Sequence, residues 1–235
     1  MEDMYDQLHN PLRGYIEVEV RDREGRIVGR GRHKMRSFVN NLLRILEGEM
    51  KAKGGAALNY YGTVVSVTVV KTDGSSGSAL IEWYNSDSGS LNARRSGGIV
   101  IAAKAADDND AYGIVVGSGT LGLSLDQYAP ASKIPHGTGP GQLDYGVSVA
   151  EDLGLDTGVT PPVYRFRITR TFSNLSGAAI NINEVCVVAV DFWRDRYSTV
   201  SDPKFLIARD VLPSTYTVPN GGTATVVVTF EVVVG

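Results

Sequence analysis

The chain has 235 residues, enough for one large all-β domain or for two small ones. Hydrophobic residues make up 43% of it and charged residues 21%, which is the composition of a globular protein and not of a disordered one. The 23 basic and 26 acidic residues give a net charge of -3, and this balance argues against a protein that coats nucleic acid through an overall positive field.

Cysteine content and the N-terminal region give two further expectations. Cys186 is the single cysteine, so an intrachain disulfide is impossible and stability must come from packing. Residues 1–12 are polar and acidic, and we expect a flexible arm without the basic region and apolar core of a secretory signal. The sequence contains no run of about 18 apolar residues, the length that a membrane-spanning helix would need. We therefore expect synthesis in the cytoplasm and no membrane association.

The first elements predicted along the chain are a β-hairpin and a helix. Residues 15–20 alternate between apolar residues and glutamates, and a turn at 21–25 leads to a return strand from Arg26. Ser37 can cap the segment 38–50, where apolar residues recur at helical spacing. This segment is the one helix we expect, and it is short and one-sided, so it should lie against a sheet.

The middle of the chain predicts several short strands and long loops. Residues 63–71 and 79–84 read as strands around a turn, followed by a Ser/Asn/Gly-rich loop at 85–98. Short strands are expected at 98–103 and 112–116. The stretch 117–162 is rich in turn residues, and we expect a long irregular section that is either a set of functional loops or a segment that wraps a neighbour.

The last third predicts four more strands. Strands at 163–172 and 180–191 are expected to form a hairpin through Ser173–Gly177. A strand over 205–211 should end at Pro213, and a glycine turn at 219–222 leads to the last strand, 223–234. The even residues of this strand are apolar, so it must be buried either by strands of its own chain or by a neighbouring subunit. We expect its edges to be paired with sister copies.

The number and spacing of these elements predict an all-β fold. About ten strands and one short helix indicate an antiparallel β-sandwich, jelly-roll-like in its strand content. No linker of low complexity divides the chain. We therefore expect a flexible arm at 1–12 and a single domain at 13–235, with long loops at about 85–98 and 117–162.

Three groups of segments carry a likeness to known proteins. They are Gly14–Val20 with Ser37–Leu43; Gly113–Gly119 with Ser124–Tyr128, Ile134–Gly137 and Leu143–Gly146; and Arg170–Asn174 with Ile182–Val185, Leu206–Val211 and Val218–Thr223. Together these segments resemble structural proteins of tailed bacteriophages, archaeal viruses and related proviruses. The resemblance implies a virion component of capsid, neck or tail, with copies of itself and other virion proteins as partners. It implies no catalytic residues, and residues 72–111 lie outside it.

Nucleophilic catalysis is not expected from this sequence. His9, His33 and His136 are the only histidines and lie far apart in different kinds of segment, and no Gly-x-Ser-x-Gly elbow is present. Cys186 lies in an apolar run, where a small buried hydrophobe is far more common than a reactive thiolate. We predict that the protein is not an enzyme and has no cofactor.

Two motifs weakly suggest ligand binding. Asp107, Asp108 and Asp110 supply oxygen ligands that Ca²⁺ prefers, but they lack the spacing of a calcium loop, and a solvated acidic turn is the more frequent outcome. Gly117, Gly119 and Gly122 resemble a dinucleotide fingerprint only superficially, because no helix follows them and no βαβ unit surrounds them, so we reject phosphate binding there.

Basic and aromatic clusters are the candidate contact surfaces. Basic residues from Arg21 to Arg36 belong either to a solvated hairpin paired with its glutamates or to a contact with an acidic neighbour, with packaged DNA a weaker alternative. The mixture of aromatic and arginine side chains at 192–197 is common at protein interfaces. The residues we expect at subunit contacts are Thr223, Val226, Val228, Phe230, Val232 and Val234 of the last strand and Phe192, Trp193, Arg194, Arg196 and Tyr197 of this loop.

These observations support a ranked set of functions. The first is a non-enzymatic virion structural protein that self-assembles by strand pairing between subunits. The alternative is a module on a virion that binds a host-surface glycan or receptor through the loops at 85–98 and 117–160. A third is a polysaccharide-active enzyme, which would need two carboxylates about 5–10 Å apart in a cleft.

Overall fold

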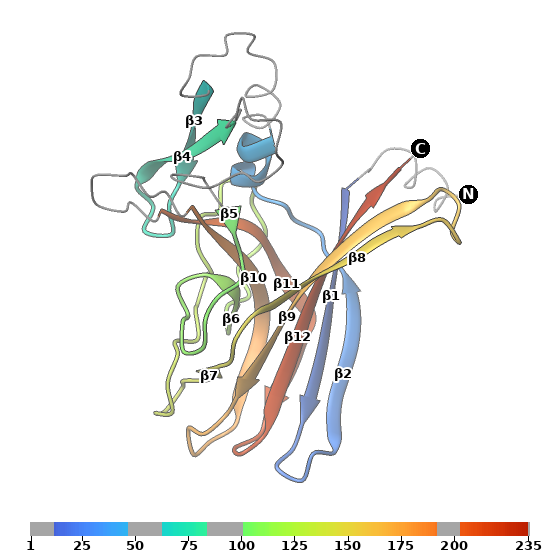
Figure 1. Ribbon diagram of the computed structural model, residues 1–235. Coiled ribbons are helices and arrows are strands. Elements are labelled where there is room, and N and C mark those ends of the chain that lie inside the picture. The colour runs from blue at the N-terminus through green and yellow to red at the C-terminus, as the bar shows by residue number, and fades with distance from the viewer. Residues whose placement is uncertain (1–11, 47–62, 84–100, 192–202, 235) are drawn as a thin grey trace.

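The computed structural model describes residues 12–46, 63–83, 101–191 and 203–234 (Figure 1). These residues form mostly antiparallel β-structure with one short helical segment at 40–46, which confirms the predicted all-β sandwich. The jelly-roll topology stays a prediction. The strands are β1 (Leu12–Arg21), β2 (Ile27–Lys34), β3 (Thr63–Val70), β4 (Ser76–Trp83), β5 (Ile101–Ala102), β6 (Gly113–Gly117), β7 (Asp144–Tyr145), β8 (Val149–Asp156), β9 (Val163–Ser173), β10 (Ile180–Asp191), β11 (Lys204–Val218) and β12 (Thr223–Val233).

Two sheets form the body of the molecule. The larger one, called sheet A here, has the order β2-β1-β12-β9, and both β7 and β8 pair with β9. The smaller one, sheet B, has the order β11-β10, and both β5 and β6 pair with β10. Strands β3 and β4 form a separate hairpin, which confirms the strand–turn–strand prediction for this region. In Figure 1 this hairpin and the helical segment lie together at one end of the sandwich.

Strand β12 is the centre of sheet A. It pairs along its length with β1 on one side, from Leu12↔Val232 to Arg21↔Thr223, and with β9 on the other, from Val163↔Val233 to Ser173↔Thr223. The expectation that sister copies pair with this strand is therefore wrong for its backbone, because both edges are occupied within the chain. The side chains of Val226, Val228 and Phe230 are buried, as the period-two pattern requires, and they belong to the core.

The main core lies between the two sheets. Alternation in β1 places Ile16, Val18 and Val20 inward and Glu17 and Glu19 outward, as predicted. Apolar side chains of β6, β10 and β11 meet them from sheet B. Full burial of each such side chain contributes about 1.5–3 kcal/mol relative to exposure, so the core is the main source of stability.

Two connections cross from one sheet to the other at the same end of the sandwich. Because β9 belongs to sheet A and β10 to sheet B, the predicted hairpin between them is wrong. The crossing is held by buried Asn174, whose amide nitrogen donates to the carbonyls of Ala178 and Val218 at 2.8 Å each. Its backbone also exchanges hydrogen bonds with Gly221 and Gly222, in the second crossing from β11 to β12. One asparagine therefore joins both connections.

Strand β11 continues through Pro213, where the sequence predicted an end. The pairing with β10 jumps from Ile182↔Tyr216 to Glu184↔Val211, so several residues of β11 bulge opposite Asn183. Proline is tolerated in a bulge on an edge strand because its missing N–H is not needed for the ladder. The bulge lets one strand of 15 residues bend along the sandwich.

The helical segment packs against the sheets, as expected, but begins at residue 40 and not at 38. Phe38 instead forms a β-bridge with Ala208 of β11. The side chain of Asn41 bonds to both backbone groups of Val70 and to the carbonyl of Leu206, so it ties the helical segment to β3 and β11. Ile45 joins a small second core with Val67, Val69, Ala189 and Phe205.

The stretch 117–162 is more ordered than predicted, since it contains β7 and β8. Strand β8 pairs with β9 from Val149↔Thr169 to Asp156↔Val163, with a bulge between Asp152 and Gly154. It is exposed on both faces, so it lacks the alternation that would reveal it in the sequence. The hairpin of β8 and β9 projects from the body of the sandwich (Figure 1). Within the described ranges, no helix is long and apolar enough to cross a membrane.

Candidate functional site

The loop after β6 is held by a buried ion pair. Glu184 of β10 and Arg209 of β11 are fully buried, and Arg209 Nε donates to the Glu184 carboxylate at 2.6 Å. The same carboxylate accepts the backbone N–H groups of Gly119, Ala131 and Ser132 at 3.3, 3.1 and 2.8 Å. Because every oxygen of Glu184 is engaged, the pair has no free group for chemistry and serves to fix the loop.

Gly117 and Gly119 are present because this loop passes close to Glu184. A Cβ on Gly117 would lie 2.3 Å from Glu184 Oε1, and one on Gly119 would lie 2.6 Å from the same atom. The Gly119 amide thus binds a carboxylate of its own chain, which agrees with the rejection of a phosphate site in the sequence analysis.

A second buried cation, Arg170 of β9, holds the segment before β6. Its guanidinium donates to five backbone carbonyls at 2.6–3.2 Å and lies 4.8 Å from the centre of the Tyr145 ring. Burial lowers the pKa of this guanidinium. The role of Arg170 is structural, because its guanidinium N–H groups donate to carbonyls of the protein itself. The carbonyls belong to Ala106, Asn109, Tyr112, Ile114 and Gly146.

His136 bridges two aspartates in the one possible metal-ligand cluster of the described residues. Its Nε2 lies 3.7 Å from an Asp108 oxygen and its Nδ1 3.6 Å from an Asp144 oxygen. The backbone N–H of Tyr145 donates to Nδ1 at 3.3 Å, so the proton of a neutral ring is on Nε2, facing Asp108. The His136–aspartate distances of 3.6 and 3.7 Å are longer than hydrogen bonds, so the three side chains form a loose polar cluster.

The other acidic candidates do not join this cluster. Asp110 accepts the His136 backbone N–H at 2.8 Å and pairs with Lys133 at 3.0 Å. Burial opposes the ionisation of Asp110, but these two partners outweigh it, and the pKa of its carboxyl is lowered. Asp107 is exposed. Of the three aspartates considered as weak metal-ligand candidates, the structure therefore brings only Asp108 to this cluster, together with His136 and Asp144, which had not been considered as ligands.

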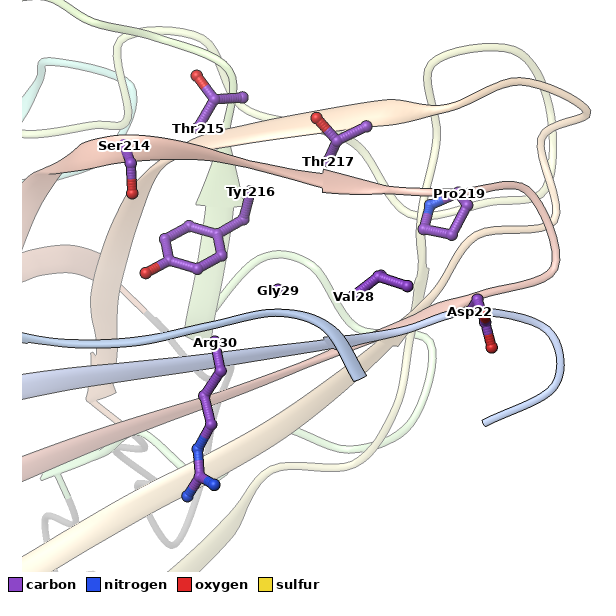
Figure 2. A pocket seen from close by; sticks show the side chains of 9 residues that line it. All are labelled: Asp22, Val28, Gly29, Arg30, Ser214, Thr215, Tyr216, Thr217 and Pro219. Carbon is purple, nitrogen blue, oxygen red and sulfur yellow. The ribbon is translucent and has the colours of Figure 1, made fainter. Parts of the chain in front are cut away.

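An open groove of about 570 Å³ lies where β2 and β11, the edge strands of the two sheets, come together. In Figure 2 the Tyr216 ring lies between the two strands. The Tyr216 hydroxyl is 2.6 Å from His33 Nε2 of β2. Asp22 is the single carboxylate in the lining, and it pairs with Arg26 at 2.7 Å, so the pair of carboxylates needed for glycoside hydrolysis is not found here. The lining residues are Asp22, Val28, Gly29, Arg30, Ser214, Thr215, Tyr216, Thr217 and Pro219.

Strand β2 forms one edge of sheet A and is strongly basic. It carries Arg30, Arg32 and Lys34 and no acidic residue. Arg30 and Arg32 are 70% and 60% exposed and reach back to Glu19 and Glu17 of β1 at 3.7 and 3.4 Å. In the part of the chain that the structure describes, β2 pairs with β1 alone, so its outer backbone edge is open.

Strand β8 forms part of the opposite edge of sheet A and is acidic. It carries Glu151, Asp152 and Asp156 and no basic residue. Glu151 pairs with Arg167 of β9, and Asp156 pairs with Arg165 of β9 at 2.6 Å. The pKa of Glu151 is lowered by its hydrogen bond from Arg167, and the pKa of Asp156 by its bond from Arg165. Among the described strands, β8 pairs with β9 alone, so this edge is open as well.

Charges on the outer face of sheet A alternate in sign from strand to strand. One row runs from Arg13 of β1 to Glu231 of β12, then to Arg165 of β9 and Asp156 of β8, with contacts of 3.6, 2.7 and 2.6 Å. Cross-strand pairs of opposite charge stabilise neighbouring strands by about 0.2–1 kcal/mol each. This row ends in negative charge at β8, and farther along β1 the glutamates Glu19 and Glu17 face the positive Arg30 and Arg32 of β2.

The predicted contact residues are distributed unevenly. Phe192, Trp193, Arg194, Arg196, Tyr197 and the arm before Leu12 lie outside the described residues. Val234 is 46% exposed, while Thr223 and Val232 are partly buried. The basic hairpin was predicted to be either a solvated surface or a contact with an acidic neighbour, and the acidic strand β8 was not singled out in the sequence. Comparison with family models, with curated proteins and with solved structures yields no match for this chain.

Proposed function

We propose that this protein is a non-enzymatic structural subunit of a virion, which assembles with copies of itself and with other virion proteins into a capsid, neck or tail component. The observation that carries the proposal is that sheet A ends in two open edges of opposite charge. An open edge is a template for strand pairing between chains. The virion assignment is supported by the resemblance of the segments given above.

The edges of sheet B make the contrast that supports assembly through sheet A. The backbone of Ile134 donates to Val116 of β6 at 3.0 Å, and Val39 donates to Ile207 of β11 at 3.2 Å. The chain thus covers sheet B with its own segments. Among the described residues, none pairs in this way with the outer side of β2 or β8.

A non-enzymatic role agrees with the way the charged groups are used. Glu184, Arg209 and Arg170 are buried and fully bonded to the protein itself. Cys186 is buried in the core, and burial raises the pKa of its thiol well above the ordinary range. A thiol with a raised pKa is a poor nucleophile.

A host-surface binding module is the alternative, and the groove between β2 and β11 is the feature that favours it. The residues Ser214, Thr215 and Thr217 line this groove, and a polar ligand such as a glycan would meet the Ser214 hydroxyl there. The hydroxyls of Thr215 and Thr217 donate instead to Asn183 and Asn181 of β10 at 2.7 and 2.8 Å. However, the ring of Tyr216 is 6% exposed and its hydroxyl is bonded to His33, so it offers no face for sugar stacking. The alternative has less support for this reason.

Sedimentation velocity of the full chain over a wide concentration range, with electron microscopy of the same samples, tests the proposal. We expect concentration-dependent growth into rings, tubes or shells. A compact monomer at every concentration would contradict the proposal. Glycan-array binding by such a monomer would favour the alternative. The virion assignment is tested separately by mass spectrometry of purified virus particles, which should contain this chain in many copies.

A further inference from the structure

We infer that copies of this protein join head to tail, with the acidic edge β8 of one copy adding to the basic edge β2 of the next. The inference rests on the proposed function and specifies the contact that would build the assembly. It commits to a second copy as the occupant of both edges, because the two edges of one sheet complement each other in charge.

The complementarity is strong for strands of equal length. Strand β2 carries three basic and no acidic residues in eight positions, and β8 carries three acidic and no basic residues in eight. The groups are accessible, since the side chains of Glu151 and Asp156 are 43% and 40% exposed and those of Arg30 and Arg32 more so. Opposite charges on facing strands steer association and select the partner.

The same charges disfavour the two symmetric alternatives. A contact of β2 with β2 would place arginines against arginines, and a contact of β8 with β8 would place carboxylates against carboxylates. Like charges directly opposite each other destabilise a strand pair. Among contacts between the described edges β2 and β8, the one that satisfies both sets of charges is β8 with β2.

The strand directions fit this contact. Each neighbouring pair from β2 through β1, β12 and β9 to β8 is antiparallel, so β2 and β8 run in the same direction. A copy displaced sideways without being turned over therefore brings its β8 beside β2 as a parallel neighbour. The outer face of sheet A in one copy then continues into the outer face of sheet A in the next copy. The alternation of charge across sheet A continues from negative β8 to positive β2 and to the glutamates of β1.

The positions of the two edges along the sheet predict a stagger between copies. Strand β2 is level with residues 223–229 of β12, and β8 is level with residues 227–233. Full overlap of the two edges thus requires each copy to shift along the strand direction. A heterologous contact of this kind closes into a ring or continues as a helical array. The projecting β8–β9 hairpin in Figure 1 has the shape to reach such a neighbour.

Exposed apolar residues accompany the charges on both edges. Ile27 and Val28 of β2 are 48% and 55% exposed, and Val149, Leu153 and Leu155 of β8 are 45%, 46% and 54% exposed. Their burial in a contact would add a hydrophobic contribution to the electrostatic one. Charge then sets the choice of partner and apolar contact adds affinity.

Charge reversal of each edge in the full chain tests the inference. The acidic-edge variant is Glu151→Lys/Asp156→Lys and the basic-edge variant is Arg30→Glu/Arg32→Glu. Each alone has two edges of the same sign and should remain monomeric at concentrations where the wild type assembles. An equimolar mixture should assemble, because each edge then meets an opposite one. The control Lys71→Glu/Lys104→Glu changes the charge as much as the basic-edge variant does, but away from both edges, and should assemble normally.

A second variant that neutralises the acidic edge without reversing its charge separates a loss of assembly from a loss of folding. Glu151→Gln/Asp156→Asn should raise the concentration at half-assembly about tenfold, since it removes two surface charge pairs. Circular dichroism should show the same fold for all variants. If the wild type assembles and the reversed variants assemble equally well, or if their mixture stays monomeric, the β8–β2 contact is wrong and the proposed function stands. If the wild type is monomeric throughout, the proposed function fails, and this inference fails with it.

Discussion

The edges of sheet B are hydrogen-bonded to other segments of the chain, whereas the edges of sheet A are not paired by the described residues. At the free side of β6, the segment around Ile134 adds backbone hydrogen bonds, and at the first half of β11 the segment around Val39 does the same. Strands β2 and β8 of sheet A receive no such cover from the described residues. The difference teaches that this chain can close an edge when closure is required. The open edges of sheet A are therefore the places to look for a partner.

The charged side chains on the open edges of sheet A also differ in burial from the ion pair of sheet B. In sheet B, Glu184 and Arg209 are fully buried and hold a loop in place. In sheet A, the charges of β2 and β8 lie on the surface, where isolated pairs contribute little to stability. Removal of one partner is therefore expected to lower the free energy of unfolding strongly in the first case and only slightly in the second.

The largest effect is expected for Arg209→Met. Loss of this guanidinium leaves the Glu184 carboxylate buried without its counter-ion, which costs about 3–5 kcal/mol of unfolding free energy. The matched control is Arg30→Met on the exposed edge, which should stay within about 0.5 kcal/mol of the wild type. Urea denaturation of both variants at neutral pH measures the difference. Equal losses in the two variants would remove the contrast drawn between the sheets.

A smaller effect is expected for Gly119→Ala in the loop that Glu184 holds. The added Cβ would lie 2.6 Å from Glu184 Oε1 and 2.8 Å from the Ala131 Cβ, so the loop must shift, at a cost of about 1–3 kcal/mol. In the same loop, a Cβ on Gly122 would meet no atom within 4 Å. Gly122→Ala should therefore be neutral or slightly stabilising. Thermal unfolding of the pair checks this, and an unchanged melting temperature for Gly119→Ala would contradict the close approach.

The smallest effect is expected on acidification of the open edge. The folded-state pKa values of Glu151 and Asp156 lie below their ordinary values of 4.5 and 3.8, mainly because Arg167 and Arg165 donate to the charged carboxylates. A lowered pKa means that the stabilisation is present above the ordinary value and is lost as the pH falls through the folded-state value. NMR titration of the carboxyl carbons measures both midpoints. Arg167→Met should return the Glu151 midpoint toward 4.5, and no change would show that the pair is not formed.

Alternating strands were predictable from the sequence, and exposed or bulged ones were not. One or both faces are buried in each of the strands β1, β9, β10 and β12. Their sequences therefore show apolar residues at every second position or in continuous runs, and this pattern predicts a strand. Strand β8 has no buried face and so no pattern. The extent of β11 was missed because Pro213 normally ends a strand, and the bulge that tolerates it depends on tertiary pairing.

The buried charges were missed although the sequence carries a signal for them. Arg170 stands between Ile168 and Phe172 on the inward positions of β9, and all three are buried. Glu184 likewise follows Ile182 at the inward spacing of β10. A charge at an inward position of an alternating strand predicts a bonded polar group in the core. Its partners cannot be predicted in this way, because the five carbonyls around Arg170 come from segments far from it along the chain.

Cys186 lies in the middle of β10 with no exposed surface, and it is the single thiol of the chain. A sulfhydryl reagent can therefore react with it only after the two layers separate. The rate of labelling in native buffer reports how often that opening occurs, without any engineered probe. The labelling rate of Cys186 therefore measures the opening of the core directly in the unmodified protein.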